Sequence, residues 1–315
     1  MIEIRGLTKR YGPTTAVDDL SFRVRPGRVT GFLGPNGSGK STTMRVALGL
    51  DRPTAGEALL DGVPYRDLRH PLRTVGALLD ARWVHPDRSA RAHLRWIAAS
   101  NALPPDRVDT VLDQVGLTAV ADRRAGGFSL GMSQRLGIAG ALLGDPGILL
   151  FDEPVNGLDP EGIHWVRQLM RGLAAEGRTV LVSSHLLSEM AMTASDLVVI
   201  GRGRLITEAT TAEFIDAAAD HTVRVRTPQP VLLAEALRRA HASVVPVDGD
   251  DLGLTVTDAT PEHIGEVAAA RGLVLHELTP QHASLEQAFL RLTGHDVEYA
   301  SGGHDEAAAV SAVGR

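Results

Sequence analysis

Lys40 stands out because lysine is almost absent from the chain. Of the 32 basic residues only Lys9 and Lys40 are lysines, so each lysine needs a reason of its own. The spacing G-x-x-x-x-G-K-[ST] surrounds Lys40 and is formed by Gly34, Gly39, Lys40 and Ser41. This spacing is typical of a phosphate-binding loop, or P-loop. It predicts a site for a nucleoside triphosphate and Mg²⁺ around Lys40.

The residue types of this loop suit the binding of phosphates. Glycines let backbone N–H groups converge on phosphate oxygens, and the next helix adds the partial positive charge of its N-terminus. Lys40 is a point charge for the β- and γ-phosphates, and the Ser41 hydroxyl is a ligand for Mg²⁺. The flanking segments RVTGFLG and KSTTMRVALGL have the patterns of a strand and a helix. The predicted nucleotide-binding residues are Gly34, Pro35, Asn36, Gly37, Ser38, Gly39, Lys40, Ser41 and Thr42.

Two adjacent carboxylates follow the apolar run GILLF. This run predicts a central parallel strand buried on both faces, and it ends in Asp152 and Glu153. Ligand groups in open α/β sheets gather at such carboxyl ends. We expect Asp152 to hold Mg²⁺ through its water shell, and Glu153 to orient and polarise the attacking water as general base.

A third predicted strand, RTVLVSSH at residues 178–185, ends in His185. We expect the imidazole of His185 to contact the γ-phosphate. Ser183 and Ser184 lie beside this histidine, but no separate partner acid accompanies them, so a hydrolytic triad is discounted. The predicted catalytic residues are therefore Glu153, His185 and Lys40.

Several motifs now follow one another in a fixed order. They are Tyr11 in KRYG, the P-loop, FSLGMSQR, ILLFDEP, VNGLDP and SSH. With them, residues 1–215 resemble the ATP-binding subunit of an ABC transporter. The resemblance implies an α/β P-loop ATPase with a mixed sheet, a helical subdomain at about residues 81–145, and ATP and Mg²⁺ as ligands. The short region between Lys40 and Ser129 argues against the related chromosome-maintenance and repair ATPases, which carry a long coiled coil.

The resemblance explains an oddity at the start of a predicted helix. Ser129 is a candidate N-cap, yet Gly131 in the first turn costs about 1 kcal/mol of helix stability relative to alanine. In ABC ATPases this segment is the signature motif, whose tip faces the γ-phosphate bound by the other subunit of the dimer. The resemblance therefore assigns Ser129 and Gly131 to ATP binding in a homodimer. Leu130 and Met132 depart from the common LSGGQ pattern, as in antibiotic-export ATPases.

Two further sites rest on the same resemblance. Tyr11 is expected to stack on adenine. Asp80 occupies the place of a glutamine that usually touches both the metal site and the membrane partner, so it is a candidate metal residue. The alternative is that Asp80 only ends a strand and faces solvent. Trp83 and Val84 suit an apolar contact with a permease helix, although core packing explains them almost as well.

Composition and charge limit the partners and the cellular location that the chain can have. The net charge of −6 and the pI of about 6.1 argue against nucleic acid as a partner. Cysteine is absent, and neither a signal peptide nor a membrane-spanning apolar stretch is recognisable. We therefore expect a cytoplasmic protein, and the resemblance implies that it lies on the inner face of the membrane through an integral-membrane permease.

The pattern changes after residue 215. Residues 216–298 read as strand, helix, strand, strand, helix, strand, which predicts a small ferredoxin-like α+β domain. An amphipathic helix at 284–294 resembles the closing segment of drug-export ATPases, and 299–315 have the composition of a disordered tail. A structural or dimer-contact role is favoured over ligand sensing for this domain.

The sequence is compatible with two functions. The first is the ATP-hydrolysing subunit of a separate membrane permease that exports a drug, antibiotic or other hydrophobic substrate. The alternative is a soluble ABC ATPase with a regulatory or ribosome-associated role. Soluble relatives usually carry two cassettes in one chain, and this chain has one set of motifs, which favours the first.

Overall fold

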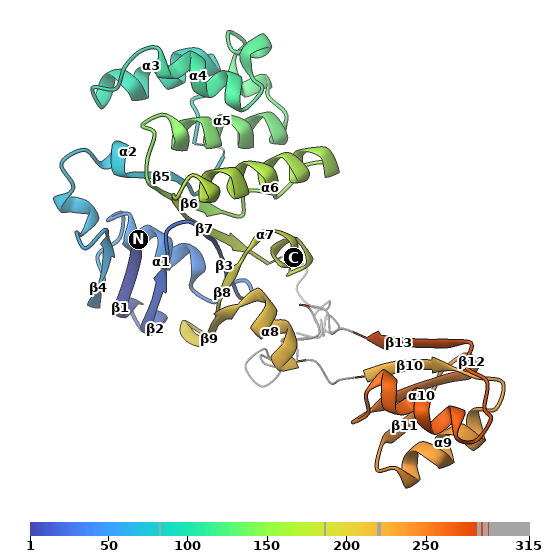
Figure 1. Cartoon of the computed structure of the whole chain (residues 1–315). Helices are drawn as coiled ribbons and strands as arrows, with labels where there is room; N and C mark the ends of the chain where they lie inside the picture. The colour runs from blue at the N-terminus through green and yellow to red at the C-terminus, as the bar shows by residue number, and fades with distance from the viewer. Residues whose placement is uncertain (82, 186, 219–221, 282–284, 286–288, 290–315) are drawn as a thin grey trace, which may run out of the picture.

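A six-stranded sheet forms the centre of the larger part of the molecule (Figure 1). The computed structural model describes residues 1–81, 83–185, 187–218 and 222–281, together with Leu285 and Phe289. The strand order is β5-β6-β7-β3-β8-β9, and only the last pair, β8 and β9, is antiparallel. This is the mixed sheet expected from the sequence. The strands are β3 (Val29–Leu33), β5 (Val75–Leu78), β6 (Ile148–Asp152), β7 (Thr179–Ser184), β8 (Asp196–Gly201) and β9 (Arg204–Thr210).

Each central strand is buried on both faces. Along β6, Leu149 and Phe151 join one hydrophobic core, whereas Ile148 and Leu150 join a second core on the other side of the sheet. Successive side chains of a strand point to opposite faces, so a continuous apolar run supplies both cores. The second core is closed by an antiparallel sheet of order β2-β1-β4, formed by β1 (Ile2–Tyr11), β2 (Thr14–Val24) and β4 (Ala55–Leu60).

Helices cover the first core and extend it. In Figure 1, α3 and α4 lie above α5, which packs against β5. These three helices fall within residues 81–145, the range expected for a helical subdomain, whose limits stay a prediction. The helices of the larger part are α1 (Lys40–Ala47), α2 (Pro71–Thr74), α3 (Ala90–Ser100), α4 (Arg107–Gln114), α5 (Leu130–Leu142), α6 (Pro160–Ala175), α7 (Leu187–Thr193) and α8 (Thr211–Ala218).

The C-terminal residues form a separate small sheet with its own core, set apart from the larger part in Figure 1. Its antiparallel strands have the order β11-β12-β10-β13. This is the ferredoxin-like arrangement expected from the element order. The elements are β10 (Thr222–Arg226), α9 (Pro230–Arg239), β11 (Ser243–Val247), β12 (Asp250–Thr257), α10 (Pro261–Ala269) and β13 (Glu277–Gln281).

Two residues beyond β13 return to the larger part. Leu285 is buried in the first core, and Phe289 packs against that core. Apart from these two residues, the expected helix at 284–294 lies outside the described residues, as does the expected tail at 299–315. The boundaries proposed at residues 215 and 298 stay predictions.

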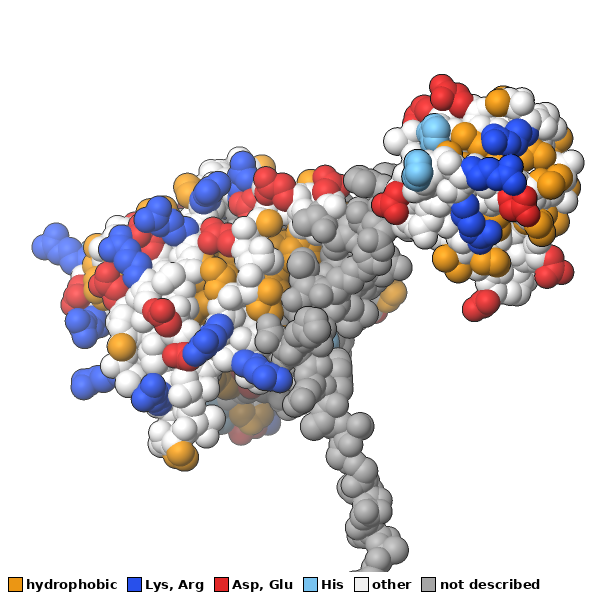
Figure 2. Space-filling view, turned by 90° about the horizontal axis from the view of Figure 1, so that it is seen from below, with side chains coloured by type: hydrophobic (Ala, Val, Ile, Leu, Met, Phe, Trp, Pro, Cys, Tyr) orange, Lys and Arg blue, Asp and Glu red, His pale blue; other side chains and the backbone are white. Residues whose placement is uncertain are grey.

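The surface mixes charges of both signs. On the face shown in Figure 2, Lys and Arg side chains lie among Asp and Glu side chains over the larger part, and apolar side chains lie between charged ones on the C-terminal domain. Val231, Leu232 and Val274 of the C-terminal domain are exposed large apolar residues. Within the described ranges, none of the helices has the length and apolar character needed to cross a bilayer.

Candidate nucleotide-binding site

The chemical groups predicted from separate motifs meet at one edge of the central sheet. Strands β3, β7 and β6 are parallel neighbours, with Leu33 paired to Ser184 and Asp152 paired to Ser183. The P-loop follows β3, Glu153 follows β6 and His185 follows β7. The P-loop, the acidic pair and His185 therefore emerge side by side at the carboxyl ends of these strands.

Glycine is sterically required at two P-loop positions. A Cβ atom on Gly34 would lie 2.5 Å from the Ile200 carbonyl oxygen, and one on Gly39 would lie 2.6 Å from the Ala16 carbonyl oxygen. Gly39 also has φ of 105°, a left-handed conformation that any other residue adopts only with strain. The loop is thus drawn tightly against its neighbours, with its N–H groups at the start of α1.

The Lys40 side chain points back into the loop. Its Nζ donates hydrogen bonds to the carbonyl oxygens of Gly34 and Pro35, at 2.7 and 3.1 Å. Burial lowers the pKa of Lys40, while the charges of Glu153 and Asp152 oppose this shift. The ammonium group therefore lies in the field of the acidic pair at the same edge of the sheet.

The residues present fit a nucleotide with Mg²⁺. Ser41 is exposed in the first turn of α1, and the buried Ser38 Oγ has no hydrogen-bond partner among the described residues. No group of three or more acidic, histidine or cysteine residues that could hold a metal occurs within the described part of the chain. Mg²⁺ suits such a site because it takes one or two protein oxygens and completes its shell with water and phosphate.

Ser183 organises the acidic pair, a role that the sequence analysis missed. Its fully buried hydroxyl hydrogen-bonds to an Asp152 carboxylate oxygen and accepts the backbone N–H of Glu153 at 3.0 Å. Glu153 has φ of 49°, which costs a non-glycine residue about 1 to 3 kcal/mol. The hydrogen bond from Ser183 helps to hold Glu153 in this turn. The sequence signal that could have identified Ser183 is a hydroxyl residue at the end of an apolar strand.

Glu153 and His185 form a pair. Nδ1 of His185 lies 2.9 Å from Oε2 of Glu153, at hydrogen-bond distance. The His185 side chain is 43% exposed and that of Glu153 is 21% exposed, so both groups are accessible to water and ligand. A carboxylate held in this way can accept a proton from water, and the imidazole fixes its orientation.

The signature segment begins α5 as expected. Ser129 is the N-cap, and its hydroxyl accepts the Met132 N–H at 3.2 Å. The side chain of Gln134 is buried and donates a long hydrogen bond of 3.5 Å to the Asn156 carbonyl oxygen. Ser129 is exposed and Gly131 is half-buried, so the tip of α5 is open to a partner. Its contact with ATP stays a prediction.

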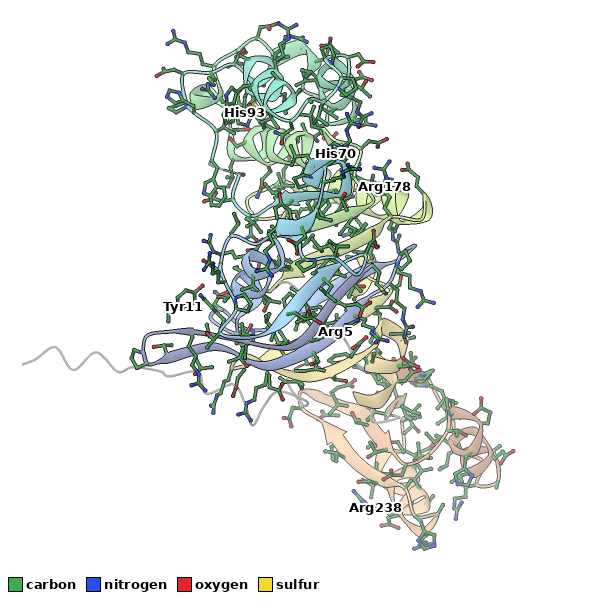
Figure 3. The ribbon with its side chains drawn as sticks, turned by 90° about the vertical axis from the view of Figure 1, so that its left-hand side faces the viewer. Arg5, Tyr11, His70, His93, Arg178 and Arg238 are labelled. Carbon is green, nitrogen blue, oxygen red and sulfur yellow. The ribbon has the colours of Figure 1, made fainter. Side chains whose placement is uncertain are left out.

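Tyr11 lies at the end of β1, on the hairpin that Figure 3 shows at the edge of the molecule. Tyr11 is 46% exposed, and its hydroxyl donates a hydrogen bond to Asp51 at 2.9 Å. Asp51 also pairs with Arg45 of α1 at 2.7 Å, while the Lys9 Nζ lies 4.7 Å from the ring centroid. The aromatic ring is therefore tied to the P-loop helix. Its stacking on adenine stays a prediction.

Asp80 is half-buried just after β5, the strand next to β6. Because Leu78 pairs with Phe151, Asp80 follows its strand at the same edge as Asp152. Half-burial is compatible with a role at the metal and with a strand end that partly faces solvent, so both interpretations stay open. The role of Asp80 at the metal stays a prediction.

The Mg²⁺ dependence of hydrolysis tests this role. Asp80→Asn keeps the shape of the side chain but removes its charge, so the Mg²⁺ concentration for half-maximal hydrolysis is expected to rise, by up to about tenfold. Adenine recognition should not change. Asp67→Asn, at an exposed carboxylate, is the control. Identical Mg²⁺ titrations for Asp80→Asn and the unmodified chain would place Asp80 outside the metal site.

Comparisons with known proteins agree with this geometry. A family model described as ABC transporter matches residues 17–156, and one described as a domain of unknown function (DUF8746) matches residues 221–286. Nod factor export ATP-binding protein I of Paraburkholderia xenovorans (strain LB400) is 36% identical over 303 residues, which cover 94% of this chain and 98% of that protein. The bacitracin transport ATP-binding protein BcrA of Bacillus licheniformis is 40% identical over 211 residues, or 66% of this chain and 69% of that protein.

A solved structure of an ABC transporter subunit has a similar fold. The protein cbiO1 from Clostridium perfringens, described as part of the ABC transporter complex cbiONQ, matches with a TM-score of 0.60 and 28% identity. The match covers 67% of this chain and 89% of that one. Since the likeness to an export ATP-binding protein runs over nearly the whole of both chains, this chain belongs to the ATP-binding subunits of ABC transporters and is an ATPase.

Proposed function

We propose that this chain is the ATP-hydrolysing subunit that drives a separate membrane permease and exports a drug, an antibiotic or another hydrophobic substrate. The observation that carries the proposal is the meeting of Lys40, Asp152, Glu153 and His185 at one sheet edge. The names of two relatives, which refer to Nod factor export and bacitracin transport, support export. The permease selects the substrate and holds the chain at the inner face of the membrane.

The residues of the site divide the reaction among them. Lys40 and the P-loop N–H groups bind the phosphates, and Ser41 and Asp152 would hold Mg²⁺. Bound Mg²⁺ supplies positive charge that offsets the charge of the phosphates. Glu153 orients and polarises the attacking water as general base, and His185 fixes the Glu153 carboxylate. The imidazole of His185 would also contact the γ-phosphate of bound ATP.

Two copies of the chain share their ATP sites in this proposal. The exposed Ser129 and the half-buried Gly131, two residues further on, form the tip of α5, and each tip completes the site of the partner. In a symmetric dimer the same surface serves both copies, so two sites form at one interface.

An apolar groove gives the permease a place to dock. It has a volume of about 310 Å³ and lies between the end of β5 and helices α3 and α5. Its lining includes Leu50, Leu72, Trp83, Val84 and Ile97, and also Asp80. Trp83 is 63% exposed and Leu50 is 52% exposed, and exposed apolar side chains that gather in one groove are typical of an interaction site.

Apart from Asp80, the described lining of the groove carries no charged side chain near pH 7, which favours a largely apolar occupant. Burial lowers the pKa of His93, and nearby Arg88 adds to the shift, so this lining histidine is neutral near pH 7. An amphipathic helix on the cytoplasmic side of the permease fits such a groove. Because Asp80 lines the groove and follows the strand next to Asp152, the occupant lies close to the ATP site.

Truncation of Trp83 tests the docking surface. Trp83→Ala removes a large anchor and is expected to lower co-purification with the membrane protein encoded by the neighbouring reading frame by about tenfold or more. ATP binding by the isolated subunit should be unchanged. Trp96→Ala is the matched control, because Trp96 is 54% exposed on α3 but does not line the groove.

The same experiment separates the two functions. Recovery of the permease with the unmodified chain and with Trp96→Ala, but not with Trp83→Ala, supports the exporter subunit. Equal recovery of the permease with both variants would show that the docking site lies elsewhere. Sedimentation of the unmodified chain with ribosomes, and no recovery of the membrane protein, would favour the soluble ABC ATPase instead.

A further inference from the structure

Leu130, at the signature tip, occupies the position where the common pattern has glycine. It is the first residue of α5 and is 48% exposed, so it contributes little to the core of its own chain. A long apolar side chain on a tip that is open to solvent therefore needs another explanation. The structure provides one in the loop of residues 155–159, which leads from Glu153 to α6.

Leu130 lies directly over Gly157 of that loop. A Cβ atom on Gly157 would be 2.0 Å from Leu130 Cδ2 and 2.9 Å from Leu130 Cγ, distances at which one group must move. Gly157 also has φ of +72°, which favours glycine. Leucine at 130 and glycine at 157 are therefore complementary in volume: the large side chain uses the space that a missing Cβ leaves.

Further contacts join the same two segments. A Cβ atom on Gly131 would lie 3.3 Å from Leu158 Cδ2, and the Gln134 side chain reaches the Asn156 carbonyl oxygen. The loop is in turn connected to the acidic pair, because the Asn156 N–H donates to the Glu153 carbonyl oxygen at 3.2 Å. A continuous set of contacts thus runs from the signature tip to the residue that carries the base.

We propose that Leu130 is a positioning residue for ATP hydrolysis. Seated on Gly157, it holds the signature tip and the loop 155–159 together as one body, so that placement of the tip on a nucleotide also sets the position of Glu153. This inference rests on the ATPase site proposed above. In this role Leu130 acts through Gly157 and the loop, and it does not contact the nucleotide.

A reversible cross-link tests the coupling directly. The chain contains no cysteine, and the Cβ position on Gly157 lies 3.8 Å from Leu130 Cβ, within the range of about 3.5 to 4.5 Å found for disulfides. The double variant Leu130→Cys, Gly157→Cys loses the leucine contact when reduced but regains a connection when oxidised. We expect hydrolysis to fall by about tenfold in the reduced form and to return to within about threefold on oxidation.

The readouts are hydrolysis, ATP affinity and the disulfide itself, all measured on the full chain. ATP affinity should stay unchanged in both redox states, since the P-loop is not altered, and a reducing agent should reverse the recovery. The two single-cysteine variants under the same oxidant are the controls. Failure of the disulfide to form would disprove the contact. Unchanged hydrolysis on oxidation would overturn the coupling, and lower hydrolysis would show in addition that the two segments must separate.

A second pair of variants covers poor folding of the cysteine protein. Gly157→Ala and Leu130→Ala are each expected to lose about tenfold in hydrolysis. If Gly157→Ala acts by displacing Leu130, the double variant should lose no more than Leu130→Ala alone. Additive loss, about a hundredfold, would overturn the inference. Gly177→Ala measures the backbone strain alone, because Gly177 has φ of +89° and nothing within 4 Å. Absence of hydrolysis in the unmodified chain would count against the proposed function instead.

Discussion

Glu153→Gln is expected to lower ATP hydrolysis by about 10²- to 10⁴-fold while ATP stays bound, the range that removal of a general base produces. The amide keeps the size of the side chain and its contact distance to His185 but cannot accept the proton of the attacking water. The P-loop, Ser41 and Asp152 are untouched, so binding of ATP and Mg²⁺ should persist. The substitution thereby separates binding from chemistry.

Two measurements check this expectation together. Phosphate release reports the chemical step, and retention of labelled ATP after gel filtration reports a closed dimer that cannot turn over. Glu235→Gln, at an exposed glutamate on α9 that has an ion pair of its own, is the control. Hydrolysis near the unmodified rate in Glu153→Gln would remove Glu153 from the role of base.

The parts of the site that the sequence predicts are those that one short segment encodes. The P-loop spacing and the apolar run before Asp152 each identify an element and its chemistry, because strand patterns and loop glycines are local signals. Placing three motifs at one edge needed only the rule that parallel strands end together. The C-terminal topology was likewise predictable from the order of its elements.

The contacts between distant segments were not predictable in the same way. Ser183 bonds to residues 30 or more positions away, and Tyr11 is tied to Asp51 across 40 positions. The meeting of Leu130 with Gly157 likewise depends on how α5 packs against the loop before α6. Such partners are chosen by tertiary packing, which a single sequence does not reveal. The C-terminal domain also carries no motif with an assigned chemistry.

Mixing two defective chains is expected to restore ATP trapping if the signature tip acts on the nucleotide of its partner. Lys40→Ala damages the P-loop, and Gly131→Asp places a carboxylate at the tip, where it would repel a triphosphate. Each variant alone forms homodimers in which both sites are damaged. In the mixed dimer one site collects both lesions, and the other combines the intact Lys40 of one chain with the intact Gly131 of its partner.

The readout is trapping of labelled ATP, with Glu153→Gln present in both chains so that occupancy does not depend on turnover. Random association makes about half of the dimers mixed, each with one intact site of two, so trapping should recover to about a quarter of that of the parent Glu153→Gln dimer. Differential tags confirm that mixed dimers form. If P-loop and tip served one nucleotide within a single chain, no site would be intact, and tagged mixed dimers without trapping would establish that arrangement. Because Ser129 and Gly131 lie on a tip open to a partner, we expect recovery.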